Sequence, residues 1–310
     1  KGIDVFGSVY KVVATNYVDP IDPEKFINSG IEGMLASLDP YTVYFDKEHK
    51  ADVDFLSSGF YGGIGASIGL RNDNAVIIEL FDGYSADRQG IRVGDKIVKI
   101  NGKEITKENY NEAIDEVKGE PGTELKLVIE RDGVSEPLEF TLQREQIEVK
   151  NITFYGFVPQ DKNTAYLRLS GFNRTAGYEI ETALIDMKKQ KEIKGLILDL
   201  RGNPGGLLDA AIDVTEKFIQ KNELVVTIMG RDSSGKKSYL AQEEPLFGKN
   251  NLVVLVDRNS ASASEIVAGA IQDHDRGIIL GETSFGKGLV QTVIPLSNNN
   301  SVKVTTGRYY

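Results

Sequence analysis

Residues 252–271 read LVVLVDRNSASASEIVAGAI. The first five of them form a short β-branched apolar run, and residues 264–271 are typical of a helix that starts just after such a strand. Several serines therefore lie on a turn between a strand and a helix, where the N–H groups of the first helical turn point outward. These groups can stabilise an oxyanion, by about 3–4 kcal/mol per donor. The alternative interpretation is a helix N-cap rich in alanine and serine, because serine is a favoured cap.

A lysine follows in the glycine-flanked turn Gly286-Lys287-Gly288, 25 positions beyond Ser262. A serine hydroxyl is a weak nucleophile, so a neighbour must take its proton, and a lysine can do so once burial lowers its pKa. The two histidines make no convincing triad, since His274 lies at the predicted helix end and His49 in a charged run. We expect both to be solvated, His274 in favourable contact with the helix dipole. The pairing of serine and lysine indicates a serine hydrolase whose base is lysine.

Three serines compete for the role of nucleophile, Ser260, Ser262 and Ser264, and their spacing does not choose between them. A resemblance does. Residues 254–266, followed by 281–291, resemble the active-site pair of the C-terminal processing peptidases, also called tail-specific proteases.

In that family the middle serine is the nucleophile and the lysine of the Phe-Gly-Lys-Gly turn is the base. The resemblance implies these roles for Ser262 and Lys287. A glutamine one helical or turn step beyond the lysine orients it in several members, and this implies an orienting role for Gln291.

A third segment agrees, residues 195–208, which read GLILDLRGNPGGLL. The pattern predicts a buried strand that runs into a glycine-rich turn and then a helix. It resembles the family's Asp-Leu-Arg-x-Asn-x-Gly-Gly loop, which implies an oxyanion hole made by the N–H groups of Gly206 and Ala263. Gly205 remains an alternative to Gly206. A tight turn that needs glycine only for positive φ is the other interpretation of the whole segment.

A different module precedes these segments, from about residue 60 to 145. The pattern predicts short strands and two helices, at 63–70, 75–80, 85–90, 94–102, 110–118, 125–130 and 138–142. The module resembles a PDZ domain, and its most specific signature is GDKIVKING at 94–102.

A PDZ domain binds an extended chain terminus as an added strand, while a glycine-rich loop donates N–H groups to the terminal carboxylate. The residues implied for this loop are Tyr61, Gly62, Gly63, Ile64 and Gly65. A hairpin with glycines in its turns is the alternative.

Residues 1–58 are expected to be helical, with apolar side chains at helical spacing in two amphipathic stretches, around Phe6 to Val13 and Phe26 to Leu35. An amphipathic helix needs a partner. We favour packing within this chain, and a homodimer through this region is the alternative that the resemblance allows. Residues 39–42 predict a turn that leads into a linker.

The composition is that of a globular protein with two or three domains: 310 residues, 40% hydrophobic and 26% charged. The net charge of −10 argues against nucleic acid as a partner, because phosphate binding needs a basic surface. The chain has no cysteine, which excludes disulfides, a thiolate nucleophile and a zinc–thiolate site. It also has no stretch of 18 apolar residues that could span a membrane. We expect neither a cofactor nor a metal.

Four other polar residues have ordinary interpretations. Asp257 could orient the site, but we expect it to cap the turn before the serine. Arg131, Arg144 and Arg168 are candidates to couple peptide binding at the PDZ domain to the active site, and a plain surface role is the interpretation we favour for each.

The resemblance covers about residues 20–310 and implies a multidomain α+β and α/β architecture. Its parts are an N-terminal helical segment (1–58), a PDZ domain (59–146) and a crotonase-like α/β protease core (147–310). The strand at 301–310 stops where family members continue, so we expect a core truncated at its C-terminal end. The family is generally exported, which implies an extracytoplasmic location in the periplasm or cell envelope. A membrane tether would then lie outside this chain.

The function implied is that of a serine endopeptidase that recognises the C-terminal tails of protein or peptide substrates through its PDZ domain and cleaves through a Ser–Lys acyl-enzyme. Two alternatives remain. A PDZ-bearing peptide-binding protein, or latent pseudoenzyme, would keep the fold without turnover. A lipase or esterase would fit the serine but not the PDZ domain.

Overall fold

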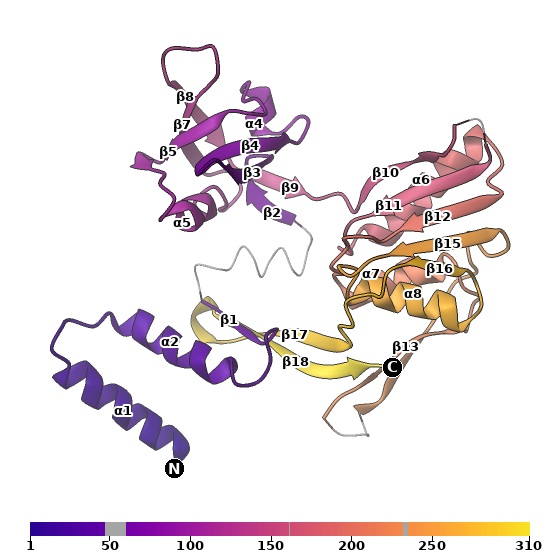
Figure 1. Ribbon diagram of the computed structural model, residues 1–310. Coiled ribbons are helices and arrows are strands. Elements are labelled where there is room, and N and C mark those ends of the chain that lie inside the picture. Colours follow the sequence, from indigo (N-terminus) through magenta and orange to yellow (C-terminus); the bar gives the residue numbers. More distant parts are fainter. Residues whose placement is uncertain (47–59, 161, 232–234) are drawn as a thin grey trace. The chain divides into compact units, whose positions relative to one another are not determined.

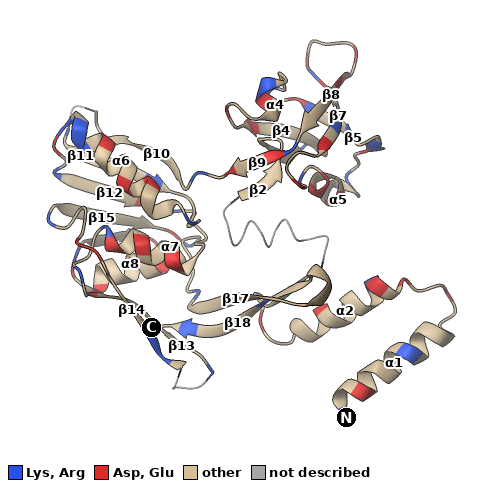
Figure 2. Cartoon of the chain, turned by 180° about the vertical axis from the view of Figure 1, so that it is seen from behind, with Lys and Arg blue, Asp and Glu red and all other residues tan. Residues whose placement is uncertain are grey.

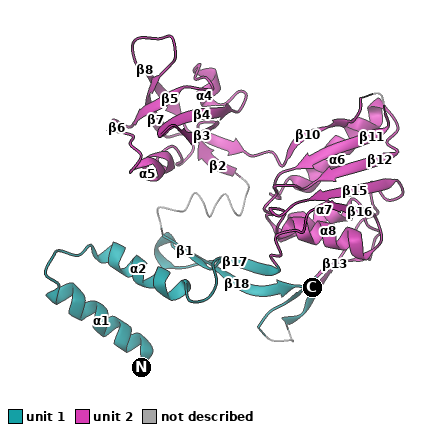
Figure 3. Cartoon of the chain, in the orientation of Figure 1, with its two compact units in different colours: residues 1–50, 227–237, 288–310 teal, residues 51–226, 238–287 magenta. Residues whose placement is uncertain are grey.

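The computed structural model describes residues 1–46, 60–160, 162–231 and 235–310 (Figure 1). The chain divides into two compact units, which Figure 3 colours separately. One unit comprises residues 1–50, 227–237 and 288–310, and the other comprises 51–226 and 238–287. His49 and the expected domain boundary near residue 58 lie outside the described residues.

The first unit combines the N-terminal helices with strands from the far end of the chain. Helices α1 (Gly2–Asn16) and α2 (Pro23–Leu35) are followed by strand β1 (Val43–Phe45). β1 pairs antiparallel with β18 (Ser301–Tyr309), which also pairs with β17 (Leu289–Pro295) across the short 3-10 turn η3 (Ser297–Asn299). The strand order of this sheet is β1-β18-β13-β14, with β13 at Leu224–Met229 and β14 at Lys237–Leu240. Only residues 227–229 of β13 and Lys237 of β14 belong to the first unit.

The expected amphipathic helices are present, but residues 43–45 form a strand. The predicted turn at 39–42 is confirmed, because Asp39 accepts hydrogen bonds from the N–H groups of Tyr41 and Thr42, both at 2.8 Å. α1 packs on α2 through the stacked rings of Tyr10 and Phe26. No residue of α1 is buried in this chain. In the described part of the chain, no helix is long and apolar enough to cross a membrane.

The PDZ module contains a sheet in the order β3-β4-β5-β7-β8, with a short β6 beside β5. Its strands are β3 (Ala66–Arg71), β4 (Asn74–Leu80), β5 (Lys96–Ile100), β6 (Lys103–Glu104), β7 (Glu124–Glu130) and β8 (Leu138–Gln143). The helices α4 (Ser85–Arg88) and α5 (Tyr110–Asp115) accompany it, and β2 (Phe60–Gly63) pairs with β9 (Glu145–Glu148). The core of the module is aliphatic, with Ile77, Leu125 and Ile129 fully buried.

The predicted order of elements in this module is therefore confirmed, with both helices shorter than expected: α4 ends at Arg88 rather than at Gly90. α5 ends at Asp115 rather than at Lys118. The Arg144 guanidinium binds the carbonyls of Glu116 and Val117 directly after the helix and so ends it.

The α/β core is a sheet in the order β10-β11-β12-β15-β16. The strands are β10 (Ile152–Phe157), β11 (Thr164–Leu169), β12 (Gly195–Asp199), β15 (Asn251–Val256) and β16 (Ile278–Gly281). β10 runs antiparallel to β11, and the other neighbours are parallel.

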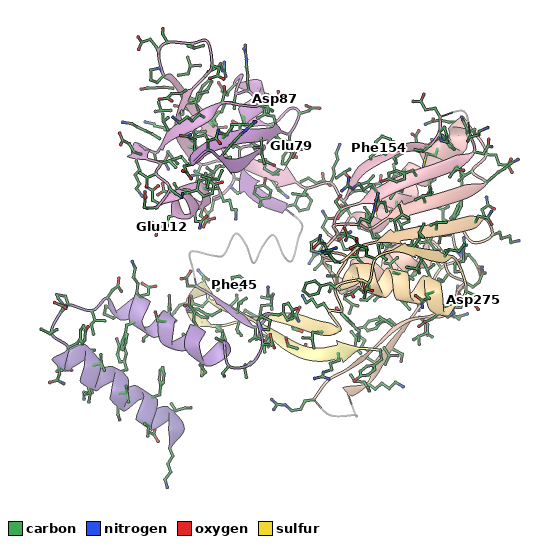
Figure 4. All side chains as sticks on the ribbon, in the orientation of Figure 1. Phe45, Glu79, Asp87, Glu112, Phe154 and Asp275 are labelled. Carbon is green, nitrogen blue, oxygen red and sulfur yellow. The ribbon has the colours of Figure 1, made fainter. Side chains whose placement is uncertain are left out.

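Three helices connect the parallel strands of the core: α6 (Ala176–Gln190), α7 (Leu208–Glu216) and α8 (Ala263–Asp273). Because each crossover advances one strand in the same direction and right-handed crossovers are the rule, the helices share one face of the sheet. α7 contacts both α6 and α8, as Figure 1 shows. Figure 4 shows side chains filling the space between helices and strands. The expected multidomain architecture of N-terminal helices, PDZ module and α/β core is confirmed.

Charged residues are distributed over both units. Figure 2 shows acidic and basic segments interspersed along the ribbons, in keeping with a net charge of −10.

Candidate active site

The sequence segments singled out above meet at one edge of the core sheet. Loops 200–207, 257–262 and 282–287 follow β12, β15 and β16, which are parallel neighbours. The carboxyl ends of parallel strands lie at the same edge, where ligand sites of open α/β sheets form. Main-chain bonds join the loops directly: Phe285 N–H donates to the Ser260 carbonyl at 3.0 Å, and Ala261 N–H donates to the Asn203 carbonyl at 3.1 Å.

The structure distinguishes the three serines. The Ser260 hydroxyl donates to the Leu200 carbonyl at 2.8 Å, and the Ser264 hydroxyl donates to the Asn203 carbonyl at 3.0 Å. Both side chains are fully buried. Within the described part of the chain, the Ser262 hydroxyl donates to no acceptor, and its residue keeps 6% exposure.

The backbone at Ser262 is also unusual. Its φ is +56° and its ψ is −112°, at the N-cap of α8. A non-glycine residue with positive φ carries strain, and such strain concentrates at functional sites. Of the three serines, Ser262 thus combines a strained backbone with a hydroxyl that is not committed to a main-chain carbonyl.

Glu265 holds the serine loop and the lysine loop together. Its Oε2 accepts the N–H of Ser262 at 2.8 Å and the N–H of Lys287 at 2.9 Å. Its Oε1 accepts the N–H of Gly286 at 2.6 Å and the hydroxyl of Ser284 at 2.8 Å. One carboxylate therefore accepts four hydrogen bonds from the two loops.

Glu265 is not among the site residues predicted from the sequence. The signal was present, because a serine followed three positions later by glutamate, just before an apolar helix, is the spacing of a capping box. That pattern predicts the bond from Glu265 to the backbone of Ser262, but not the bonds to residues 284–287.

The backbone of the glycine-rich loop (200–207) packs closely against the backbone around Ser262. A side chain at Gly205, whose φ is +98°, would place its Cβ 2.9 Å from the Ala263 nitrogen and 2.6 Å from the Ala261 carbonyl oxygen. A Cβ at Gly206 would lie 2.3 Å from the Phe172 carbonyl oxygen. Glycine is required at both positions by close backbone approach.

Gly205 and Gly206, the two glycines considered for the oxyanion hole, differ in whether their N–H groups are engaged by the protein. The Gly205 N–H donates to Asn203 Oδ1 at 2.9 Å. Among the described residues, neither Gly206 N–H nor Ala263 N–H donates to a protein acceptor. Asn203 is fully buried and also donates from Nδ2 to the Leu169 carbonyl at 2.9 Å, which fixes the loop to the end of β11.

An ion pair between a buried aspartate at the end of β12 and the exposed Arg201 lies at the start of the same loop. Asp199, which is fully buried, accepts two bonds from the Arg201 guanidinium, at 2.9 and 2.6 Å, and one from the Tyr166 hydroxyl at 2.5 Å. Burial by itself would raise the pKa of Asp199, but the bonds from Arg201 and Tyr166 outweigh it and hold the pKa below its usual value. The pair anchors the loop to β11.

Three other residues were considered from the sequence: Gln291, Asp257 and His274. Gln291 is on strand β17 rather than on a helix or turn, in the other compact unit, where its Nε2 donates to Thr305 Oγ1 at 3.3 Å. Asp257 accepts the N–H groups of Gly202 and Asn259, and these main-chain bonds lower its pKa, as the turn-capping interpretation predicts. His274 is the C-cap of α8, but its ring contacts the Leu224 carbonyl at 2.8 Å and is less solvated than expected.

In the PDZ module, residues 61–65 span the end of β2 and the turn into β3. The carbonyls of Ile64 and Gly65 face inward, where they accept the N–H groups of Ala86 and Phe81 at 2.9 and 2.8 Å. Within the described residues, the N–H groups of Ile64 and Gly65 donate to no acceptor. β3 is an end strand of its sheet in the described part of the chain, so its outer edge can accept another strand.

Two arginines expected at the surface are not there. Arg144 is buried and donates to the carbonyls of Val117 and Glu124 and to Thr123 Oγ1, besides the Glu116 carbonyl. The Arg131 side chain is 15% exposed and forms a double hydrogen bond with buried Asp95. The surface interpretation was wrong for both, because each guanidinium donates hydrogen bonds to buried acceptors. Arg168 is exposed.

Fold and site together define a class: a serine-type hydrolase on a parallel α/β core with an attached PDZ domain. Comparison with known proteins agrees. The family model of peptidase family S41 matches residues 163–310, that of the PDZ domain matches 58–130, and that of the activating protease CtpB N-terminal domain matches 2–49.

Curated relatives match along the whole chain. The carboxy-terminal-processing protease of Bartonella bacilliformis is 40% identical over 313 residues, which cover 100% of this chain and 71% of that protein. The carboxy-terminal processing protease CtpB of Bacillus subtilis is 33% identical, with 98% of this chain and 63% of that protein covered. The solved structure of the photosystem II D1 C-terminal processing protease is 29% identical with a TM-score of 0.55, over 98% of this chain and 87% of that one.

This chain belongs to the carboxy-terminal processing proteases of peptidase family S41, and it is a serine-type peptidase with a PDZ domain. The predicted family and enzyme class are confirmed. In the described residues, no group of three or more histidine, aspartate or glutamate side chains is arranged to hold a metal ion.

Proposed function

We propose that the chain cleaves protein substrates through Ser262 as nucleophile and Lys287 as general base, after its PDZ domain has bound the substrate's C-terminal tail. The observation that carries the proposal is the Glu265 carboxylate, which binds the backbone N–H groups of both residues at 2.8 and 2.9 Å. A base must lie within reach of the proton that it abstracts, and a shared anchor holds the two loops in fixed register.

The chemistry follows from these positions. The Ser262 oxygen attacks the carbonyl carbon of the scissile peptide while the neutral Lys287 amine takes the hydroxyl proton. The resulting ammonium gives this proton to the leaving nitrogen as the carbon–nitrogen bond breaks, which leaves an acyl-enzyme on Ser262. Water then attacks the ester while the same amine accepts its proton, and the ammonium gives that proton to the Ser262 oxygen as the carbon–oxygen bond breaks. In this scheme Gln291 orients the lysine.

The N–H groups of Gly206 and Ala263 form the oxyanion hole in this proposal. Both lack a protein acceptor among the described residues, whereas the N–H of Gly205 is taken by Asn203. Donors held by the fold before reaction stabilise the developing negative charge without reorganisation.

Tail recognition is assigned to residues 61–65 and strand β3. The inward-facing carbonyl of Ile64 turns the Gly65 N–H of the same peptide outward, and the Ile64 N–H also has no acceptor among the described residues, so both can meet a terminal carboxylate. The open edge of β3 can pair with the residues before it. Ligands are therefore proteins or peptides bound by their C-terminus, and no nucleic acid is expected.

We extend the proposal to assembly and location on the family relationship. The exposed apolar side chains of α1, among them Phe6 and Val9 at 55% each, suit a homodimer contact. The protein is assigned to the periplasm or cell envelope, with any membrane tether outside this chain. Sedimentation of the purified chain tests the dimer, and fractionation of cells that produce the native protein tests the location.

The experiment that tests the chemistry is cleavage of an unstructured protein with an apolar C-terminus, followed by mass spectrometry. Ser262→Ala and Lys287→Ala should each abolish cleavage. Lys303→Met is the matched control, because Lys303, on β18, is like Lys287 partly buried, and burial lowers the pKa of Lys303. If the parent chain does not cleave but does bind the tail, it is a PDZ-bearing binding protein; if Lys303→Met alone abolishes cleavage, the base is misassigned.

A further inference from the structure

A dense polar cluster lies at the start of β10, outside the residues assigned above. Asn151, which is 2% exposed, is its centre. Its Nδ2 donates to Glu179 Oε1 at 2.7 Å, and Glu179 Oε2 accepts the N–H groups of Asn151 and Ile152 at 2.9 and 3.0 Å. Glu179 lies in α6, so the cluster joins the start of β10 to that helix.

Asn151 also holds both ends of the segment that follows β11. Its main-chain carbonyl accepts the N–H of Ser170 at 2.7 Å, and its Oδ1 accepts the N–H of Asn173 at 2.8 Å. Asn173 Nδ2 in turn donates to the Val149 carbonyl at 2.7 Å. The segment 170–173 is thereby fixed on either side of Phe172.

Phe172 is the residue on which the glycine-rich loop rests. It is 2% exposed and forms an isolated parallel bridge with Gly206. Its carbonyl accepts the N–H of Leu207 at 2.7 Å and would lie 2.3 Å from a Cβ at Gly206. The Phe172 backbone therefore holds the peptide between Gly206 and Leu207 directly, and through the bridge it fixes the position of the Gly206 backbone.

We propose that Asn151 is a positioning residue for the oxyanion hole: through residues 170–173 it fixes Phe172, and Phe172 fixes the direction of the Gly206 N–H. The inference rests on the role proposed above for Gly206. An oxyanion donor must point at the place where charge develops, so a small rotation of this peptide costs rate without weakening substrate binding. Asn203 secures Gly205 from the other side, so the loop is held at both glycines.

The decisive variants exchange the amide and the carboxylate. Asn151→Asp keeps the acceptor for Asn173 but sets a second carboxylate against Glu179. Asn151→Asp combined with Glu179→Gln restores the bond between the two side chains and an acceptor for the N–H groups of residues 151 and 152. We expect Asn151→Asp to lower kcat by about 10-fold or more with KM within about twofold, and the double variant to recover part of that loss.

The control is Asn250→Ala. Asn250 is an exposed asparagine whose Nδ2 also donates to a main-chain carbonyl, that of Ile193, and it lies just before β15. It should leave kcat and KM unchanged per folded molecule. If Asn151→Asp lowers only the urea midpoint and keeps kcat, or if the double variant recovers nothing, the positioning role is refuted.

A second measurement separates this proposal from the assignment of the catalytic residues. Hydrogen exchange of the Leu207 amide, followed on the Ser262→Ala background, should speed up at least about 10-fold in Asn151→Asp and not in Asn250→Ala. Unchanged exchange overturns the proposed link from Asn151 to the loop. Faster exchange, together with a Ser262→Ala variant that still cleaves, would support the link and refute the proposed nucleophile.

Discussion

The backbone N–H groups of Ser262 and Lys287 converge on a single oxygen, Glu265 Oε2, at 2.8 and 2.9 Å. The two residues are 25 positions apart and belong to loops after different strands, β15 and β16. The strand pairing alone would leave these loops free to shift. The shared carboxylate makes their separation a property of the fold.

Replacing this carboxylate should damage catalysis more than folding. Glu265→Gln puts an amide that donates hydrogen bonds among four donors, so at least one loop must move. We expect kcat to fall by about 100-fold, since displacements of about 1 Å can have that effect. Steady-state kinetics with a quenched peptide checks this, and urea unfolding reports the change in stability.

The matched control is Glu282→Gln. Glu282 is an exposed acid of the lysine loop whose partner is the exposed Arg258 at 3.1 Å. Exposed pairs contribute at most about 1 kcal/mol, so this variant should keep activity within about twofold. Equal losses in both variants would mean that loss of negative charge near the site, and not the anchor, is responsible.

Two substitutions in the glycine-rich loop separate the effect of backbone strain at positive φ from the effect of a steric clash by an added Cβ. Both Gly205 and Gly202 have positive φ, +98° and +73°. A Cβ at Gly202 meets nothing within 4 Å, whereas one at Gly205 would lie 2.9 Å from the Ser262 Cβ. Gly202→Ala should cost about 1 kcal/mol of stability and keep activity. Gly205→Ala should cost about 3 kcal/mol and abolish cleavage, as measured by urea unfolding and by turnover; retained cleavage would show that the loop is not part of the site.

Acid should weaken the loop through Asp199. Its pKa in the folded chain is held below the usual value. A carboxyl group with a lowered pKa contributes stability above its unfolded pKa of about 3.9, and that contribution is lost as pH falls through the folded pKa. Asp199→Asn should therefore destabilise by about 2 kcal/mol at pH 7, because the buried position loses the charge that strengthens its hydrogen bonds from Arg201 and Tyr166. Urea unfolding from pH 7 to 3 should show the gap between parent and variant closing below about pH 4; a gap that stays constant contradicts the assignment.

The PDZ module should depend on Arg144 for its stability. Arg144→Met leaves the carbonyls of Glu116, Val117 and Glu124 without this donor, and an unsatisfied buried acceptor costs about 1–3 kcal/mol. We expect about 3 kcal/mol of destabilisation and weaker binding of a C-terminal peptide. Arg92→Met, at an exposed arginine of the same module, should change neither. Thermal unfolding and peptide titration of the whole chain make the comparison, and loss of binding in both variants would point to a general effect of positive charge.

The order of elements was predictable because it depends on local pattern. Apolar runs marked the strands of the PDZ module and, in the core, the strand before the glycine-rich loop and the strand before Ser260 that leads into α8. The failures share one cause. Arg131 and Arg144 follow the pattern of surface residues, yet each is the partner of buried acceptors supplied by residues distant in sequence. Strand β1 was missed because it pairs with residues 301–303, and no local signal reports such a partner.

The choice of nucleophile shows the same division. From the residues alone, three serines were equivalent, and a family resemblance favoured Ser262. The tertiary structure supplies a physical reason, because the hydroxyls of Ser260 and Ser264 are engaged by the carbonyls of Leu200 and Asn203, which lie about 60 positions away.

By itself, the sequence determined the order of elements in the PDZ module, the strand and helix around Ser262 and the chemical types of the candidate residues, since these follow from short-range periodicity and from residue identity. Only the tertiary structure decided which backbone groups are open and which are engaged. Glu265 belongs to the site because parallel strands bring two loops to one edge of the sheet. Asn151 reaches that edge through a chain of hydrogen bonds between segments that are distant in sequence. Such relationships depend on how buried donors and acceptors are paired across the whole core, and no local pattern encodes that pairing.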